Sequence, residues 1–140
     1  MFENPPRAEI DALLKRARTI AIIGLSDTPG RPSHNVAKAL QKFGYRIVPV
    51  NPAATEILGE RSWPDLASAV QNAGPIDVVD VFRRPEHVPA IVDEAIRLAL
   101  PALWLQDGVI DEAAAGRARA AGIFTVMNRC MFRDRSTLAA

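Results

Sequence analysis

The stretch Thr19-Ile20-Ala21-Ile22-Ile23-Gly24 decides the fold class of this chain. Four apolar residues follow one another between a threonine and a glycine, without a polar residue at every second position. A short, continuous apolar run of this kind predicts a strand that is buried on both faces, as in a parallel sheet. A polar loop follows the glycine, and an amphipathic stretch at residues 33–44 predicts a helix. The first unit is therefore a strand followed by a helix.

This unit repeats along the chain. Further strands are expected at residues 46–50, 77–82, 102–105 and 123–126, and further helices at residues 7–18, from Pro85 and from about Asp111 to Gly122. A brief edge strand near residues 59–63 and a short helix from Pro64 complete the pattern. Because strands alternate with helices, the crossovers should be right-handed. We predict an α/β, Rossmann-like, doubly wound fold with a mainly parallel sheet of about five strands and helices on both faces.

Two residues refine this prediction. Pro49 has no backbone N–H to donate, so the strand at residues 46–50 is expected at or near an edge of the sheet. Ser33 is expected to cap the helix that follows it, and Gly44 to close that helix.

Composition excludes several classes of protein. The 140 residues suit a single domain spanning 1–140, and the net charge of +1 gives no reason to expect a nucleic acid or an acidic membrane as partner. One cysteine and two histidines leave no basis for a disulfide or a metal centre. The start of the chain does not resemble a signal peptide, and no stretch approaches the roughly 20 apolar residues that span a bilayer. We expect a cytoplasmic protein.

In doubly wound sheets, ligands bind beyond the carboxyl ends of the strands, where the strand order reverses. The informative residues are therefore those directly after each expected strand. They are residues 24–33, Asn51 and Pro52, residues 83–85, residues 106–108 and residues 128–130.

The first of these loops contains Gly24, Ser26, Arg31 and Ser33 in front of a helix N-terminus. Free N–H groups at such an end suit a phosphate, and glycine allows its close approach. The loop carries neither the dinucleotide fingerprint G-x-G-x-x-G nor the P-loop signature. The alternative interpretation is an ordinary loop with a serine cap.

Asn51 and Pro52 end the second expected strand, where NAD-binding folds usually place an acidic residue for the ribose. The missing carboxylate argues against NAD and leaves room for a ligand with a phosphate near its ribose. The alternative is a simple Asn-Pro turn.

Arg83 and Arg84 precede Pro85, at a helix N-terminus where cations oppose the helix dipole by about 0.3–1 kcal/mol each. A bound anion would remove this conflict. Alternatively, the arginines are a solvated pair or partners of Asp80 or Glu86.

Other polar residues fit structural roles better. Asp80, within an apolar strand, is expected to be a buried, hydrogen-bonded acid. His34 and His87 are expected to be exposed or capping, Cys130 to be a small buried thiol and Trp104 to pack in the core.

Several motifs together resemble the family of stand-alone CoA-binding domains. They are residues 20–26, 31–33, 45–52 and 78–85, extended by residues 103–106 and 128–130. The resemblance covers roughly residues 7–135. The family is in turn similar to the N-terminal domain of the succinyl-CoA synthetase α subunit. It implies coenzyme A, or an acyl-CoA, as the ligand.

The resemblance also implies roles for the strand-end residues. Gly24, Leu25 and Ser26, with the helix after Ser33, would hold the diphosphate. Asn51 and Pro52 would lie by the adenosine, and Phe82, Arg83, Arg84 and Pro85 would clamp the nucleotide. The pantetheine arm would run toward Gln106 and Gly108. Asp107 departs from the small or apolar residue expected before Gly108.

The parts of the synthetase that carry its phosphorylated histidine and its nucleotide-grasping domain have no counterpart in this sequence, and no Ser-His-Asp set or P-loop replaces them. We therefore expect no catalytic residues and a CoA-binding protein that is non-catalytic alone. Two alternatives remain: an NAD(P)-binding oxidoreductase-type domain, and a subunit that presents CoA to a separate catalytic protein.

Overall fold

Five parallel strands form the central sheet in the order β2-β1-β5-β6-β7. The computed structural model describes residues 1–138. The strands are β1 (Thr19–Ile23), β2 (Arg46–Val50), β5 (Val78–Val81), β6 (Ala102–Leu105) and β7 (Phe124–Val126). The chain moves outward from β1 to β2 in one direction and through β5, β6 and β7 in the other. The order therefore reverses beside β1, and the predicted Rossmann-like, doubly wound α/β fold is confirmed.

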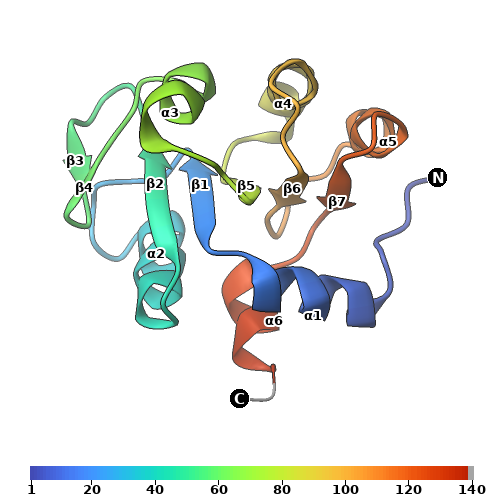
Figure 1. Ribbon diagram of the computed structural model, residues 1–140, viewed down its shortest axis with the longest axis horizontal. Coiled ribbons are helices and arrows are strands. Elements are labelled where there is room, and N and C mark those ends of the chain that lie inside the picture. The colour runs from blue at the N-terminus through green and yellow to red at the C-terminus, as the bar shows by residue number, and fades with distance from the viewer. Residues whose placement is uncertain (139–140) are drawn as a thin grey trace.

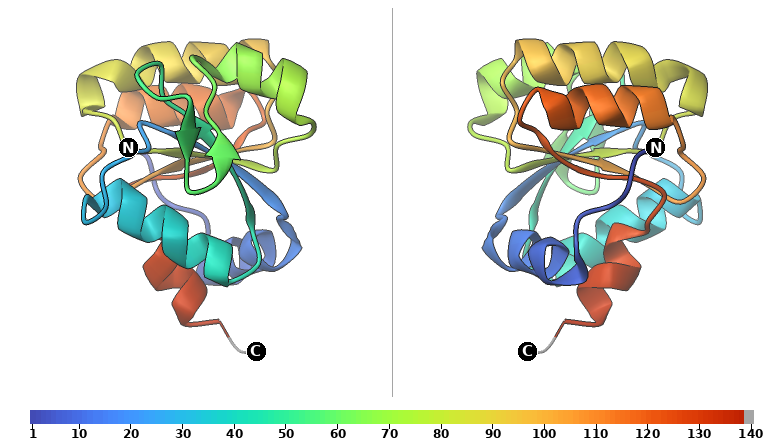
Figure 2. Two further views of the ribbon diagram at one scale, coloured as in Figure 1. Left: turned by 90° about the vertical axis from the view of Figure 1, so that its left-hand side faces the viewer. Right: turned by 90° about the vertical axis from the view of Figure 1, so that its right-hand side faces the viewer.

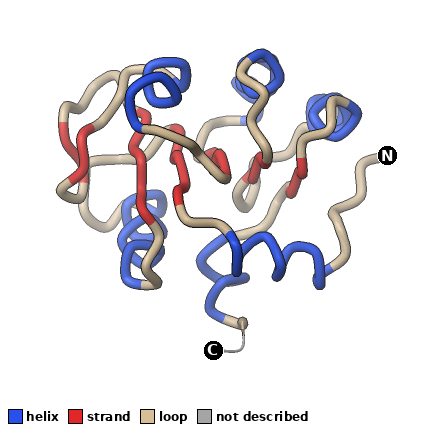
Figure 3. The backbone as a smooth tube through the Cα atoms, viewed as in Figure 1, coloured by secondary structure: helices blue, strands red, loops and turns tan. Residues whose placement is uncertain are grey.

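Helices cover both faces of the sheet (Figure 1). One layer contains α1 (Arg7–Arg16), α2 (Pro32–Lys42) and α6 (Met131–Ser136), and the other contains α3 (Leu66–Ala73), α4 (Val88–Arg97) and α5 (Glu112–Ala120). Side chains of β1 alternate between the two cores: Ile20 and Ile22 pack on the α2 side, whereas Ala21 and Ile23 pack on the α3 side. All five residues of β1 are buried, which explains its uninterrupted apolar sequence. Figure 3 shows the sheet between the helices.

Strand β2 lies at the edge of the sheet, as Pro49 predicted. The Pro49 carbonyl faces outward and accepts a hydrogen bond from the Trp63 N–H at 3.0 Å. The nitrogen of the same residue faces the same way, so the missing N–H removes no bond to β1. The single strand expected near residues 59–63 is instead the hairpin β3 (Glu56–Ile57) and β4 (Glu60–Arg61), which lies beside this edge (Figure 2).

The N-terminus of α2 differs from the prediction. Arg31 is the N-cap and Pro32 is the first helical residue, where its missing N–H costs nothing. Ser33 is therefore not the cap, and its hydroxyl instead accepts a hydrogen bond from the Ser26 N–H at 2.9 Å. His34, expected to be exposed or capping, is only 8 % exposed, because the first turn of α2 packs against the sheet.

Two further helices begin later than predicted. Asp65 caps α3, which starts at Leu66 rather than Pro64, by accepting a hydrogen bond from the Ser68 N–H at 2.7 Å. Pro85 opens the 3₁₀ turn η1 (Pro85–His87), and the α-helix begins only at Val88.

Helix α6 was not predicted, because its six residues are mostly polar and show no apolar period. Buried Asp134 holds it in place: the Nε and Nη2 atoms of Arg129 each approach the carboxylate to 2.7 Å, and Arg7 Nη1 approaches it to 3.2 Å. Within residues 1–138, no helix is long and apolar enough to cross a membrane.

Candidate functional site

Gly24 joins two of the predicted site segments at the carboxyl edge of the sheet. A Cβ added to Gly24 would lie 2.2 Å from the Phe82 carbonyl oxygen and 2.9 Å from Arg83 Cδ. The φ angle of +81° is also one that side-chain-bearing residues rarely adopt. The loop after β1 and the segment after β5 can therefore touch only because residue 24 is a glycine.

The loop after β1 leads directly into the N-terminus of α2. The hydrogen bond from the Ser26 N–H to buried Ser33 ties its start to the helix, and the Ser26 hydroxyl accepts one from the Thr28 N–H at 3.1 Å. Leu25 is fully buried, whereas Arg31 is exposed at the helix start. The loop thus presents a cation and a helix N-terminus, a combination that suits an anion.

Asn51 ties the end of β2 to the same loop. Its Nδ2 donates to the Leu25 carbonyl at 2.9 Å, and its Oδ1 accepts from the Ala53 N–H at 2.8 Å. The Asn-Pro pair does form a turn, as one interpretation predicted, and this turn borders a cavity of about 450 Å³. Arg61 and Ser62 line that cavity as well.

A smaller cavity, of about 180 Å³, lies where β1 and β2 end beneath α3 and α4. Ile23, Val50, Leu66 and Ile91 give it a mainly apolar lining, and Glu94 lies at its border. Together, the two cavities flank the end of β2.

The two arginines after β5 occupy different environments. Arg83 is half-buried, with its stem against Gly24. Arg84 is exposed, and its Nε lies 3.0 Å from Glu86 Oε1. One alternative from the sequence, a pairing with Glu86, is therefore present for Arg84. A pair whose side chains are 79 % and 65 % exposed contributes little to stability.

Asp80 and Gln106 form a buried pair behind the carboxyl edge. Asp80 is fully buried, as predicted, and Gln106 Nε2 donates to its Oδ1 at 2.6 Å. Burial raises the pKa of Asp80 to about 8, and the hydrogen bond from Gln106 offsets part of that rise. Its Oδ2 has no hydrogen-bond partner within residues 1–138. At neutral pH the acid is mostly protonated, and it holds the Gln106 side chain in place.

The loop after β6 is held from the opposite side by α6 and the residues before it. The Gly108 N–H donates to Asn128 Oδ1 at 2.8 Å, and Arg133 contacts both carboxylate oxygens of Asp107 at 2.9 and 3.0 Å. This ion pair accounts for an acidic residue where the family resemblance implied a small or apolar one. Cys130, expected to be buried, is partly exposed.

The structure thus brings the ends of β1, β2, β5 and β6 to one edge, with Arg31, Arg83 and Arg84 among them. The part of the chain that is described holds no group of three or more His, Cys, Asp or Glu side chains that could bind a metal. The arrangement can bind an anion through a helix N-terminus and guanidinium groups.

Residues that the sequence did not point to also border this edge: Arg61 and Ser62 beside Asn51, and Arg133 beside Asp107. A hairpin that folds back on β2 and an unexpected helix carry them. No local pattern in the sequence marked either contact.

Comparison with known proteins places these features in a family. Residues 18–135 match a family described as "CoA binding domain". The chain is 41 % identical over 130 residues to the Bacillus subtilis protein YneT, and the match covers 93 % of this chain and 94 % of that protein.

Two solved structures resemble the chain over nearly its whole length. A protein from Pyrococcus horikoshii has a TM-score of 0.87 and 33 % identity, with 99 % of each chain covered. A Thermus thermophilus protein has a TM-score of 0.87 and 33 % identity, covering 94 % of this chain and 98 % of that one. By sequence, a more distant relative is an ADP-forming acetate–CoA ligase of Archaeoglobus fulgidus, at 26 % identity. That match covers 71 % of this chain but only 15 % of the ligase.

Proposed function

This chain belongs to the family of CoA-binding domains, and on that premise we propose that it binds coenzyme A or an acyl-CoA at the carboxyl edge of its sheet. The junction at Gly24 carries the proposal. Phe82 and Arg83 contact the loop after β1, and Asn51 bonds to the same loop through Leu25. Three strand ends therefore form one continuous surface beside the N-terminus of α2.

The diphosphate lies, in this proposal, against Gly24, Ser26 and the start of α2. Free N–H groups of the first helical turn and the helix dipole stabilise negative charge there. Arg31, at the end of the loop, and Arg83, against its start, supply cations. A charge-assisted hydrogen bond of this kind contributes about 1.5–3 kcal/mol.

The adenosine lies beside Asn51 and Pro52, in the cavity that Arg61 and Ser62 also line. No carboxylate follows β2, so nothing there favours the ribose diol of NAD. Arg61 instead offers a cation to a ribose that carries a phosphate, as the ribose of CoA does.

The pantetheine arm runs toward Gln106 and Gly108. Asp80 fixes the first of these residues and Asn128 the second. Asp107, paired with Arg133, borders this end of the path.

We further propose that the isolated chain binds its ligand without acyl or phosphoryl transfer, because its sequence carries no P-loop and no recognisable Ser-His-Asp set. Incubation with ATP, CoA and a panel of carboxylic acids is expected to form no acyl-CoA above the uncatalysed rate. Turnover that persists through further purification contradicts this part of the proposal.

A second candidate function is favoured by the match to an ADP-forming acetate–CoA ligase, of which this chain covers 15 %. A segment that is one part of a larger ligase suggests that this chain presents CoA to a separate catalytic protein. Calorimetric titration with CoA, NAD and NADP tests the binding that both candidates require. CoA should bind most tightly, whereas tighter binding of NAD or NADP overturns the proposal.

A further inference from the structure

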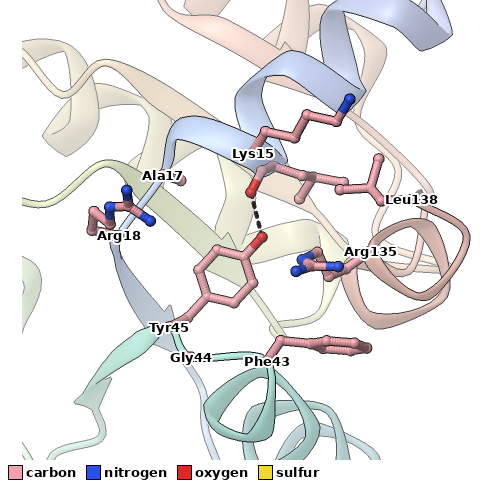
Figure 4. Close-up of a pocket in the computed structure, with 9 residues that line it drawn as sticks. Lys15, Ala17, Arg18, Phe43, Gly44, Tyr45, Arg135 and Leu138 are labelled. Atoms are coloured by element: carbon pink, nitrogen blue, oxygen red, sulfur yellow. Dashed lines mark hydrogen bonds between the residues drawn. The ribbon is translucent and has the colours of Figure 1, made fainter. Parts of the chain in front are cut away.

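A cavity of about 420 Å³ lies at the opposite, amino edge of the sheet (Figure 4). It forms where α1, α2 and α6 end and where β1 and β2 begin. Tyr45, which directly precedes β2, and Arg18, which directly precedes β1, both line this cavity. The carboxyl-edge site lies beyond the other ends of the same strands, so the two sites are separate.

Three cations from three segments line this cavity: Lys15 of α1, Arg18 after it and Arg135 of α6. Its lining includes no acidic residue, and within residues 1–138 none of the three side chains forms an ion pair. The nearby Asp77 carboxylate instead accepts hydrogen bonds from the backbone N–H groups of Arg18 and Thr19, at 2.8 and 2.9 Å. No acidic side chain in its lining therefore pairs with these cations.

Arg135 is held in position by aromatic rings. Its Cζ lies 4.5 Å from the centroid of the Phe43 ring and 5.8 Å from that of Tyr45. Stacking leaves the in-plane N–H groups of a guanidinium free to bind two oxygens of an anion. Figure 4 shows this guanidinium beside the Tyr45 ring, with Arg18 on the opposite side of that ring.

Tyr45 does not supply a compensating negative charge. Its hydroxyl donates a hydrogen bond to the Leu14 carbonyl, and burial raises the pKa of the phenol above its usual 10. The tyrosine is therefore neutral at physiological pH and adds only an apolar wall.

Stabilisation of helix ends explains these cations only in part. Lys15 and Arg135 lie in the last turns of α1 and α6, where a cation interacts favourably with the helix dipole. Arg18 lies beyond the end of α1 and gains nothing comparable. Dipole stabilisation also gives no reason for cations from three separate segments to line one cavity.

We propose that this cavity is a second ligand site, which binds a small polyanion carrying phosphate or carboxylate groups. The ligand sits against the Tyr45 ring, which lies between Arg18 and Arg135, with Lys15 at the rim. Its binding does not depend on the ligand at the carboxyl edge.

The single tyrosine of the chain allows a direct test. Protein labelled with 3-fluorotyrosine has one ¹⁹F resonance, at Tyr45, which is titrated with inorganic pyrophosphate and, separately, with citrate, each with and without saturating CoA. The variants Arg135→Gln and Arg18→Gln are compared with Lys38→Gln, which removes the same charge from the exposed side of α2. Thermal melting confirms that each variant is folded.

A saturable shift of the resonance is expected, unaffected by CoA and weakened about tenfold or more by either arginine substitution but not by Lys38→Gln. The probe that binds more tightly identifies the ligand as a phosphate or a carboxylate. The proposal fails if neither probe gives a saturable shift, if all three variants weaken binding equally, or if CoA competes with the probe. Because the CoA titration is separate, failure here leaves the proposed function intact.

Discussion

Gln106 Nε2 donates a hydrogen bond of 2.6 Å to Asp80 Oδ1, whereas Asp80 Oδ2 has no partner within residues 1–138. A fully buried carboxyl with one partner is more stable protonated than charged. The protonation state of Asp80 therefore affects Gln106, which lies at the proposed pantetheine path.

The first prediction concerns this acid. Folding raises the pKa of Asp80 from 3.8 to about 8, so the native state holds a proton that the unfolded state releases within this range. The contribution of Asp80 to the free energy of unfolding should fall as pH rises from about 4 to 8, by up to about 1.4 kcal/mol per pH unit. Asp80→Asn removes this dependence. Urea denaturation at pH 6 and 8 should show a loss about 2 kcal/mol larger for wild type than for the variant.

Exposed Asp27→Asn is the control, because it removes a carboxyl without changing the buried pair. If wild type and Asp80→Asn lose equal stability between pH 6 and 8, Asp80 is not protonated in the native state.

The second prediction concerns the arginines after β5. Arg83→Gln should weaken CoA binding about 10- to 100-fold, through the loss of a charge-assisted hydrogen bond. Arg84→Gln should have a smaller effect, because this side chain is exposed and already paired with Glu86. Calorimetry measures both affinities, and melting without ligand should change little because the surface pair contributes little.

Arg16→Gln, an exposed cation on α1, controls for the change in net charge. CoA affinities equal to wild type in Arg83→Gln, Arg84→Gln and the double variant would place the ligand elsewhere.

The third prediction separates the contact at Gly24 from its backbone conformation. Gly24→Ala places a methyl group 2.2 Å from the Phe82 carbonyl at a φ of +81°, and should lower the free energy of unfolding by about 2–4 kcal/mol. Gly30→Ala has a comparable φ of +94° but meets no atom within 4 Å, so only the conformational cost of about 1 kcal/mol should remain. Chemical denaturation compares the two variants. Equal losses would show that close contact with Phe82 is not what requires a glycine.

The fourth prediction concerns the end of β2. Asn51→Asp replaces the amide that donates to the Leu25 carbonyl with an acceptor, and adds a negative charge beside the proposed ribose phosphate. CoA affinity should fall at least about tenfold, and the free energy of unfolding by about 1–3 kcal/mol. Asn72→Asp, on α3 and away from the proposed site, is the matched control, because Asn72 Nδ2 donates to the Ser68 carbonyl at 2.8 Å at an exposed position. If both variants bind CoA like wild type, the adenosine does not lie beside Asn51.

Much of the architecture could be predicted because the relevant signals are local. Continuous apolar runs identified all five strands of the sheet, since a strand buried on both faces tolerates few polar residues. Pro49 predicted the edge position of β2 through one missing donor. Helix α6 and the β3–β4 hairpin were missed or simplified, because both are short and depend on partners elsewhere, such as Arg7 and Arg129 around Asp134.

The sequence by itself determined the fold class, the strands, the edge at which a ligand should bind and the resemblance to CoA-binding domains. Only the tertiary structure decided which residues meet there: Gly24 against Phe82, Asn51 against Leu25, and Arg133 against Asp107. It also decided that Lys15, Arg18 and Arg135 line one cavity. Hydrophobic period and turn chemistry describe only near neighbours in the chain. Contacts between distant segments depend on how helices and loops pack onto the finished sheet, which no local pattern records.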